Sequence, residues 1–192
     1  MSTTTVLLCG VGGQGTILAA DLLARTAIAA GLDVKISEIH GMAQRGGSVT
    51  TTVRFGESVD SMVADLGDSD YIISFETTEA LRNLPYLKEG GKMLVSDETI
   101  TPVTVLIGAQ KMPKGAHETL AAEGALLMPA VQIAKEAGTA KASNVALLGA
   151  LSAFLDFDPA IWEEAIAKRV PPKTIDTNLK AFRNGRAFAL EN

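Results

Sequence analysis

The chain alternates short apolar runs with longer amphipathic stretches, a pattern typical of a sheet covered by helices. Val6–Cys9 is an apolar run between threonine and glycine, which predicts a buried strand. Residues 15–30 lack interior glycine and proline and end before Gly31, which predicts a helix. Asp33–Ile39 alternates apolar and polar side chains, as a second strand does. Strand, glycine turn, helix and strand form a βαβ unit, which normally is right-handed and has parallel strands.

After Ile39 the pattern departs from a regular doubly wound fold, because a glycine-rich loop and a β-type run follow where a helix is expected. Apolar and β-branched runs predict further strands at Ser48–Phe55, Tyr71–Phe75, Lys92–Ser96 and, as an additional one, Thr104–Ile107. Thr78–Leu84 predicts a short helix between two of them.

The last third of the chain is predicted to be helical. Proline starts, glycine ends and apolar periodicity predict helices at Pro129–Ala137, Ser143–Leu155, Pro159–Lys168 and Lys173–Ala189. The sequence shows no internal repeat, charge block or long linker. Residues 1–192 are therefore predicted to form a single three-layer α/β/α domain with a mostly parallel sheet, a Rossmann-like start and a helical C-terminal third.

Composition narrows the possible partners and the compartment. With 192 residues, 47% hydrophobic, the chain can bury a sizeable core. A net charge of −5 and 5% aromatic residues disfavour binding to a phosphate backbone or stacking on bases, so no nucleic-acid partner is expected. The N-terminus has no basic segment, and no run of 18 apolar residues occurs, so we expect a cytoplasmic protein without membrane contact.

The first candidate site is the glycine turn after the first predicted strand. Its sequence, GVGGQG, satisfies the G-x-G-x-x-G pattern and leads into a helix. Glycine allows positive φ and close approach of a ligand, and the free amides at the start of the helix favour an anion. Candidate cofactor-binding residues are Gly10, Gly12, Gly13, Gln14 and Gly15. The alternative is a tight strand–helix turn packed against protein.

The second candidate site is the segment HGMAQRGGS, which begins at His40. Its glycines flank a lone Arg45 at the carboxyl end of the second strand, the edge where open α/β sheets bind ligands. Arg45 and the first glycine turn are therefore expected to converge. The guanidinium can grip a carboxylate or phosphate, which makes Arg45 the candidate catalytic residue, with Gln44, Gly46 and Gly47 as cofactor-binding residues. The alternative is that Arg45 pairs with a nearby acidic side chain.

The remaining reactive side chains carry weaker signals. Cys9 lies in the apolar strand and is expected to be buried and inert. A single cysteine excludes an internal disulfide and a four-thiolate iron–sulfur cluster. His40 is interpreted as a hydrogen-bonded loop residue in preference to a general base, and His117 as a solvated residue. No cysteine partners either histidine, so no metal site is predicted.

Together, GVGGQG and HGMAQRGGSV resemble the gamma domains of 2-oxoacid:ferredoxin oxidoreductases, and within them the small (beta) subunits of the indolepyruvate type. The first motif is general to the superfamily, and the second is more specific. Further matching segments are Lys141-Ala142-Ser143-Asn144, Leu147–Ala150 and Asn178–Phe188. The resemblance covers nearly the whole chain; Thr99–Glu123 fits least well and receives no role.

The resemblance implies oxidative decarboxylation of a 2-oxoacid, here an aryl pyruvate, with CoA to acyl-CoA, CO2 and reduced ferredoxin. It implies a large (alpha) subunit as partner, which carries thiamine diphosphate, Mg and the iron–sulfur clusters. This chain would bind no cofactor alone and would be inactive alone. Its loops would complete the active site at the subunit interface, where CoA is also expected, and ferredoxin would meet the complex.

Two other functions stay open from the residues themselves. A stand-alone dinucleotide-dependent oxidoreductase would use the glycine turn with Glu38 as the acid that binds ribose. The β-type run after Ile39 counts against it, because a mononucleotide-binding half needs a helix there. A non-catalytic assembly module would use the glycine loops only to pack on a partner.

Overall fold

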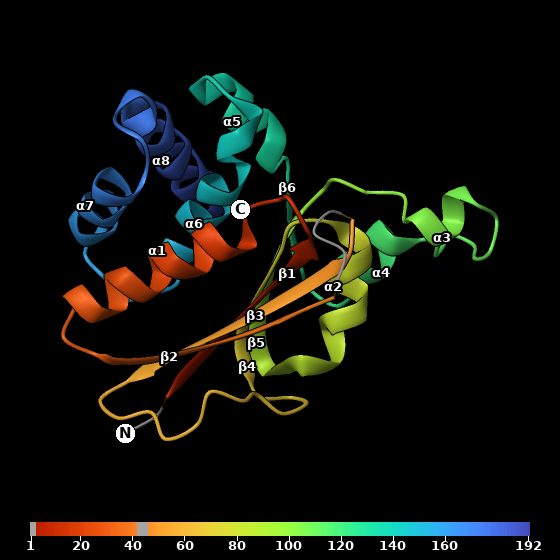
Figure 1. Cartoon of the computed structure of the whole chain (residues 1–192), viewed down its shortest axis with the longest axis horizontal. Helices are drawn as coiled ribbons and strands as arrows, with labels where there is room; N and C mark the ends of the chain where they lie inside the picture. Colours follow the sequence, from red (N-terminus) through yellow and green to blue (C-terminus); the bar gives the residue numbers. More distant parts are fainter. Residues whose placement is uncertain (1–2, 42–45) are drawn as a thin grey trace.

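A six-stranded sheet with helices on both faces forms the centre of the molecule, as the computed structural model of residues 3–41 and 46–192 describes it (Figure 1). The strand order is β2-β3-β1-β4-β5-β6. The strands are β1 (Thr4–Val11), β2 (Asp33–His40), β3 (Ser48–Gly56), β4 (Ser69–Ser74), β5 (Leu87–Ser96) and β6 (Leu126–Met128). The predicted three-layer α/β/α class is confirmed.

Strand β3 runs against its neighbours and separates the first two strands of the chain. It pairs antiparallel with β1 on one side and with β2 on the other. The pairs β1–β4, β4–β5 and β5–β6 are parallel, which confirms the mostly parallel sheet. Strands β1 and β2 therefore share a direction, but they are not neighbours, because β3 occupies the position between them.

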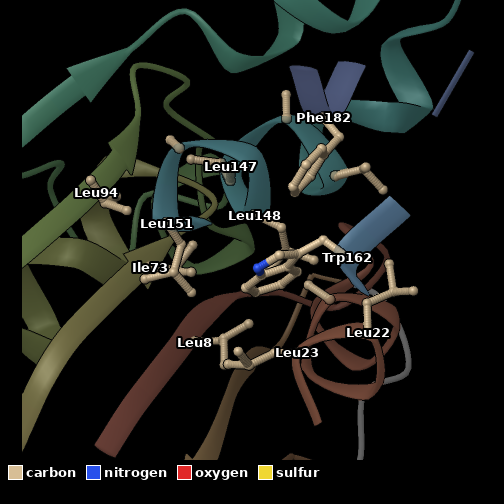
Figure 2. Close-up of a cluster of buried hydrophobic side chains, with 14 of the residues drawn as sticks. Leu8, Leu22, Leu23, Ile73, Leu94, Leu147, Leu148, Leu151, Trp162 and Phe182 are labelled. Carbon is tan, nitrogen blue, oxygen red and sulfur yellow. The ribbon is translucent and has the colours of Figure 1, made fainter. Parts of the chain in front are cut away.

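The larger core lies on one face of the sheet. Figure 2 shows Trp162 and Phe182 packed with leucines from two helices against Leu8 and Ile73 of the sheet. The helices on this face are α1 (Thr16–Ala29), α5 (Ala130–Ala137), α6 (Ser143–Ser152), α7 (Pro159–Arg169) and α8 (Ile175–Glu191), with short 3-10 turns at Ala140–Ala142 and Pro172–Thr174.

The opposite face has a smaller core around Leu7, Cys9 and Ile72. It is covered by α2 (Thr77–Asn83), the 3-10 turn Leu84–Tyr86 and α4 (Ala116–Ala122). Among the described helices, none combines the length and apolar character needed to cross a membrane.

Helices α6 and α8 approach each other at two glycines. A methyl group added at Gly149 would overlap the main chain of Phe182, and one added at Gly185 would overlap the main chain of Ala146. Every residue of α6 from Asn144 to Ser152 is buried, so this helix lies between the sheet and α8. The absence of a side chain at both glycines lets the two backbones touch.

The structure differs from the sequence prediction in three places. Thr104–Ile107 is not a strand, because Val103–Leu106 forms a short helix, α3. Strand β5 begins at Leu87, before the predicted start at Lys92. Strand β6 and helix α4 were not predicted, since β6 has only three residues and α4 buries only Leu120.

Candidate functional site

The two glycine-rich segments are hydrogen-bonded to each other at one edge of the sheet. The Gly12 amide donates to the Gly47 carbonyl over 2.8 Å, and the Gly46 amide donates to the Gly12 carbonyl over 3.4 Å. The cause is the antiparallel pairing of β1 with β3, which sets Val11 opposite Ser48. The residues that precede β3 therefore lie beside those that follow β1.

Among the predicted site residues, the structure brings together the glycines of both segments. Gln44 and Arg45 lie outside the described residues, so the roles assigned to them stay predictions. Gly46 and Gly47 contact Gly12 directly, and the expected convergence of Arg45 with the glycine turn stays a prediction.

Tight packing surrounds part of the glycine turn. A Cβ atom at Gly10 would lie 2.7 Å from Oε1 of Gln14 and 3.0 Å from Cβ of Phe75. Gly15 has a φ of +85°, and a Cβ there would lie 2.5 Å from Nδ2 of Asn144. Gly13 has a φ of +104° but no described atom within 4 Å of a Cβ position, so its surroundings are open. Of Gly10, Gly13 and Gly15, Gly13 is the one with space for a ligand or a partner at its Cα.

The Gln14 side chain holds the ends of two parallel strands together. Its Oε1 accepts a hydrogen bond from the Val11 amide at 2.8 Å, and its Nε2 donates to the Phe75 carbonyl at 2.9 Å. Both ends of the side-chain amide are thus bound to main chain. Gln14 therefore stabilises the shape of the turn, and its contact with a cofactor stays a prediction.

A cleft of about 490 Å³ opens where helices α1 and α6 begin. Its lining includes the turn residues Gly13 to Gly15, Lys141 and Asn144. Gly15 precedes helix α1 and provides no side-chain cap, so the first amides of the helix remain available to an anion. Together with the Lys141 ammonium, these amides make this side of the cleft attractive to a phosphate or carboxylate group.

Sequence reasoning missed two further residues of the cleft. Ser96, the last residue of β5, and Glu98 line it. The Ser96 Oγ atom is buried and has no hydrogen-bond partner among the described residues. The signal that could have found both residues is their place after a buried parallel strand, at the edge where α/β folds bind ligands.

The other reactive side chains lie apart from this cleft. Cys9 is fully buried, its Sγ donates to the Glu79 carbonyl at 3.6 Å, and burial raises the pKa of its thiol to about 12. His40 is exposed, with Nδ1 3.0 Å from the Gly41 carbonyl. His117 is exposed beside the Asp97 carbonyl. The inert thiol and the two surface histidines agree with the sequence interpretation.

Glu38 does not occupy the position that a dinucleotide fold requires. In that fold the acidic residue ends the strand next to the glycine-turn strand. Here Glu38 belongs to β2, and β3 lies between β2 and β1. The topology therefore disfavours the dinucleotide alternative. In the described part of the chain, no three His, Cys, Asp or Glu side chains gather as a metal site would need.

The fold is that of a gamma-type subunit of the 2-oxoacid oxidoreductases. The structure of a keto/oxoacid ferredoxin oxidoreductase gamma subunit from Geobacter sulfurreducens matches with a TM-score of 0.74 and 25% identity, over 98% of this chain and 99% of that one. Residues 5–188 match the sequence family described as pyruvate ferredoxin/flavodoxin oxidoreductase. The chain belongs to this family.

Relatives of the same length sharpen the comparison. The indolepyruvate oxidoreductase subunit IorB of Thermococcus kodakarensis is 41% identical, over 100% of this chain and 98% of its own length. The subunit of the same name from Pyrococcus horikoshii is 39% identical, with the same coverage. The resemblance noted from the two motifs is confirmed, and the chain is a subunit of a multi-subunit oxidoreductase.

Proposed function

We propose that the chain is the small subunit of an indolepyruvate-type 2-oxoacid:ferredoxin oxidoreductase. With a large subunit it would convert an aryl pyruvate and CoA to acyl-CoA and CO2, and pass two electrons to ferredoxin. The observation that carries this proposal is the Gly12–Gly47 hydrogen bond, which joins the general and the specific family motif in one site. The full-length similarity to indolepyruvate oxidoreductase subunits supports the substrate class.

The iron–sulfur clusters do not fit the donor groups of this chain. A cluster needs about four thiolates, whereas this chain has one cysteine, which is buried in the sheet. We therefore assign the clusters to the large subunit, and the family resemblance implies the same place for thiamine diphosphate and Mg. This chain would contribute the glycine edge and its cleft to an active site completed at the interface.

The role of this chain would be to hold and orient an anion. The cleft beside Gly13 offers helix amides and Lys141 to the phosphates of CoA or thiamine diphosphate, or to the carboxylate of the 2-oxoacid. Arg45, immediately before Gly46, would add a guanidinium that grips such a group at two points. Glu98, which also lines the cleft, would repel a second anion there.

A non-catalytic assembly module remains the second candidate, and the Gln14 side chain favours it. That side chain binds only main chain of its own subunit in the described contacts. In that case the glycine segments would form a rigid surface that packs against the large subunit, and no substrate would contact them.

Variants of Arg45 in the assembled complex distinguish the two candidates. Loss of a charge-assisted hydrogen bond, worth about 1.5–3 kcal/mol, lowers kcat/KM by about 10- to 150-fold. We expect Arg45→Lys to be impaired and Arg45→Ala more so, with subunit assembly intact. A raised KM for the 2-oxoacid or for CoA identifies the anion that Arg45 holds. If Arg45→Ala stays within about twofold of the wild type for both substrates, the assembly module is favoured.

A further inference from the structure

Glu79 is a buried carboxylate that binds the end of the second glycine segment. The residue is 4% exposed and lies in the first turn of α2. Its Oε2 accepts a hydrogen bond from the Ser48 hydroxyl at 2.5 Å, and its Oε1 lies 3.1 Å from Nε of the exposed Arg82. Ser48 directly follows Gly47 and begins β3. A side chain of the helical layer thus reaches across to the chain segment that forms the site.

The carboxylate of Glu79 is not needed to cap its own helix. Glu76 already performs that task, since its side chain accepts hydrogen bonds from the amides of Thr78 and Glu79. Removing a carboxylate from water costs free energy unless partners compensate. Here the partners are Ser48 and Arg82, and only Ser48 belongs to another element. The buried carboxylate therefore stabilises the contact between α2 and β3.

The main chain of Glu79 is itself held in place. Its carbonyl accepts hydrogen bonds from the Cys9 thiol in β1 and from Nδ2 of Asn83. Both donors are buried, and Cys9 belongs to the smaller core. The carboxylate therefore projects from a fixed point, and a fixed acceptor restricts the position of the hydroxyl that binds it.

From these contacts we infer that Glu79 is a positioning residue for the glycine site, acting through Ser48. The carboxylate holds Ser48, Ser48 fixes the adjoining Gly47 carbonyl, and that carbonyl accepts the Gly12 amide. The relay ends at the turn that opens helix α1 and its cleft. The effect on turnover rests on the proposed function; the effect on the Gly12–Gly47 contact does not.

The test combines hydrogen exchange with kinetics, both on the complex with the large subunit. Ser48→Ala removes the donor. Ser69→Ala is the matched control, because Ser69 is the first residue of β4, at the end of the sheet far from the glycine segments, and its buried Oγ has no partner among the described residues. We expect Ser48→Ala to speed amide exchange in the peptides covering residues 10–15 and 46–50 by about tenfold. The Ser69→Ala complex should exchange there like the wild type.

The chemistry of the relay is tested by two further variants. Glu79→Gln keeps an oxygen that can accept from Ser48, and Ser48→Thr keeps the hydroxyl, so both should remain within about threefold of wild-type exchange. Kinetically, Ser48→Ala should raise KM for the anionic substrate and lower kcat/KM about 5- to 20-fold, with an unchanged melting temperature of the complex. Ser48→Thr should restore KM.

Each outcome decides one claim. Equal exchange in Ser48→Ala and Ser69→Ala complexes overturns the positioning role, whatever the activity. If Ser48→Ala speeds exchange but the wild-type complex turns over no 2-oxoacid, the positioning role is supported and the proposed function is overturned. Faster exchange together with an unchanged KM and kcat limits Glu79 to a structural contact and overturns the inference.

Discussion

The Nδ2 atom of Asn144 donates a hydrogen bond to the Gly15 carbonyl over 3.2 Å, which fastens the start of helix α6 to the start of helix α1. The two residues lie 129 positions apart in the chain. Because Gly15 has no side chain, the Asn144 amide can pass directly over its Cα. This contact brings together two helix starts that are distant in the sequence and that both line the cleft.

Substitution of Gly15 tests this contact, with the other end of the same helix as control. Gly15 and Gly31 share a φ of +85°, but a Cβ meets Asn144 at Gly15 and open space at Gly31. Gly31→Ala should lower the free energy of unfolding by about 1–2 kcal/mol through backbone strain alone. Gly15→Ala should cost roughly 1–3 kcal/mol more through overpacking. Urea denaturation measures both free energies of unfolding. Equal losses in the two variants would show that the Asn144 side chain moves aside without loss of stability.

The α6–α8 contact should tolerate no added methyl group. Gly149→Ala places Cβ against the main chain of Phe182, which cannot rotate away. We expect a loss of roughly 3 kcal/mol or more in the free energy of unfolding, at the upper end of overpacking effects. Gly41→Ala is the control, since its Cβ would have no described atom within 4 Å. A loss in Gly149→Ala no greater than in this control would mean that the helices separate easily.

Asp33 should contribute a pH-dependent part of the stability. The Val59 amide, at 2.9 Å from Oδ2, and then the Lys35 ammonium lower the pKa of its carboxyl. A pKa that is lower in the folded state gives stability that is fully present above the unfolded value of about 3.9 and is lost as the pH falls through the folded value. Unfolding free energies measured between about pH 2 and pH 6 should therefore fall less steeply on acidification in Asp33→Asn. Parallel curves for the two proteins would contradict this.

The thiol of Cys9 should be unreactive until the protein unfolds. With a pKa of about 12, roughly one molecule in ten thousand carries a thiolate at pH 8. Its full burial also blocks access. Iodoacetamide should therefore label the native chain far more slowly than the urea-unfolded chain, as measured by mass spectrometry. Similar labelling rates in the two states would show that the sheet opens at β1.

Local sequence patterns predicted most elements of this fold but not the order of its strands. The β-branched run around Val53 indicated a strand, yet its two partners, Val6 in β1 and Ile36 in β2, depend on contacts that no local pattern encodes. Helices with several apolar positions were found, whereas α4, which buries only Leu120, gave too little signal.

The site residues could be predicted only in part, because local sequence patterns do not encode tertiary contacts. The glycines stand out because few other residues accept a positive φ, as Gly13 and Gly15 do. The dual hydrogen bonding of Gln14 was not foreseen, since its second partner, the Phe75 carbonyl, comes from a distant strand. Glu79 reaches the site through tertiary packing alone, so no motif marked it, whereas Ser96 was marked only by its place at the end of a buried strand.

The most direct test of the central claim is electron transfer by the two subunits, separate and combined. The large subunit of an indolepyruvate oxidoreductase is mixed with this chain, and viologen reduction is followed with indolepyruvate and CoA, and with pyruvate and 2-oxoglutarate as competing acids. We expect turnover only when both subunits are present, and we expect it to be fastest with indolepyruvate. Equal turnover by the large subunit alone, or a complex without activity on any aryl pyruvate, would contradict the proposed function.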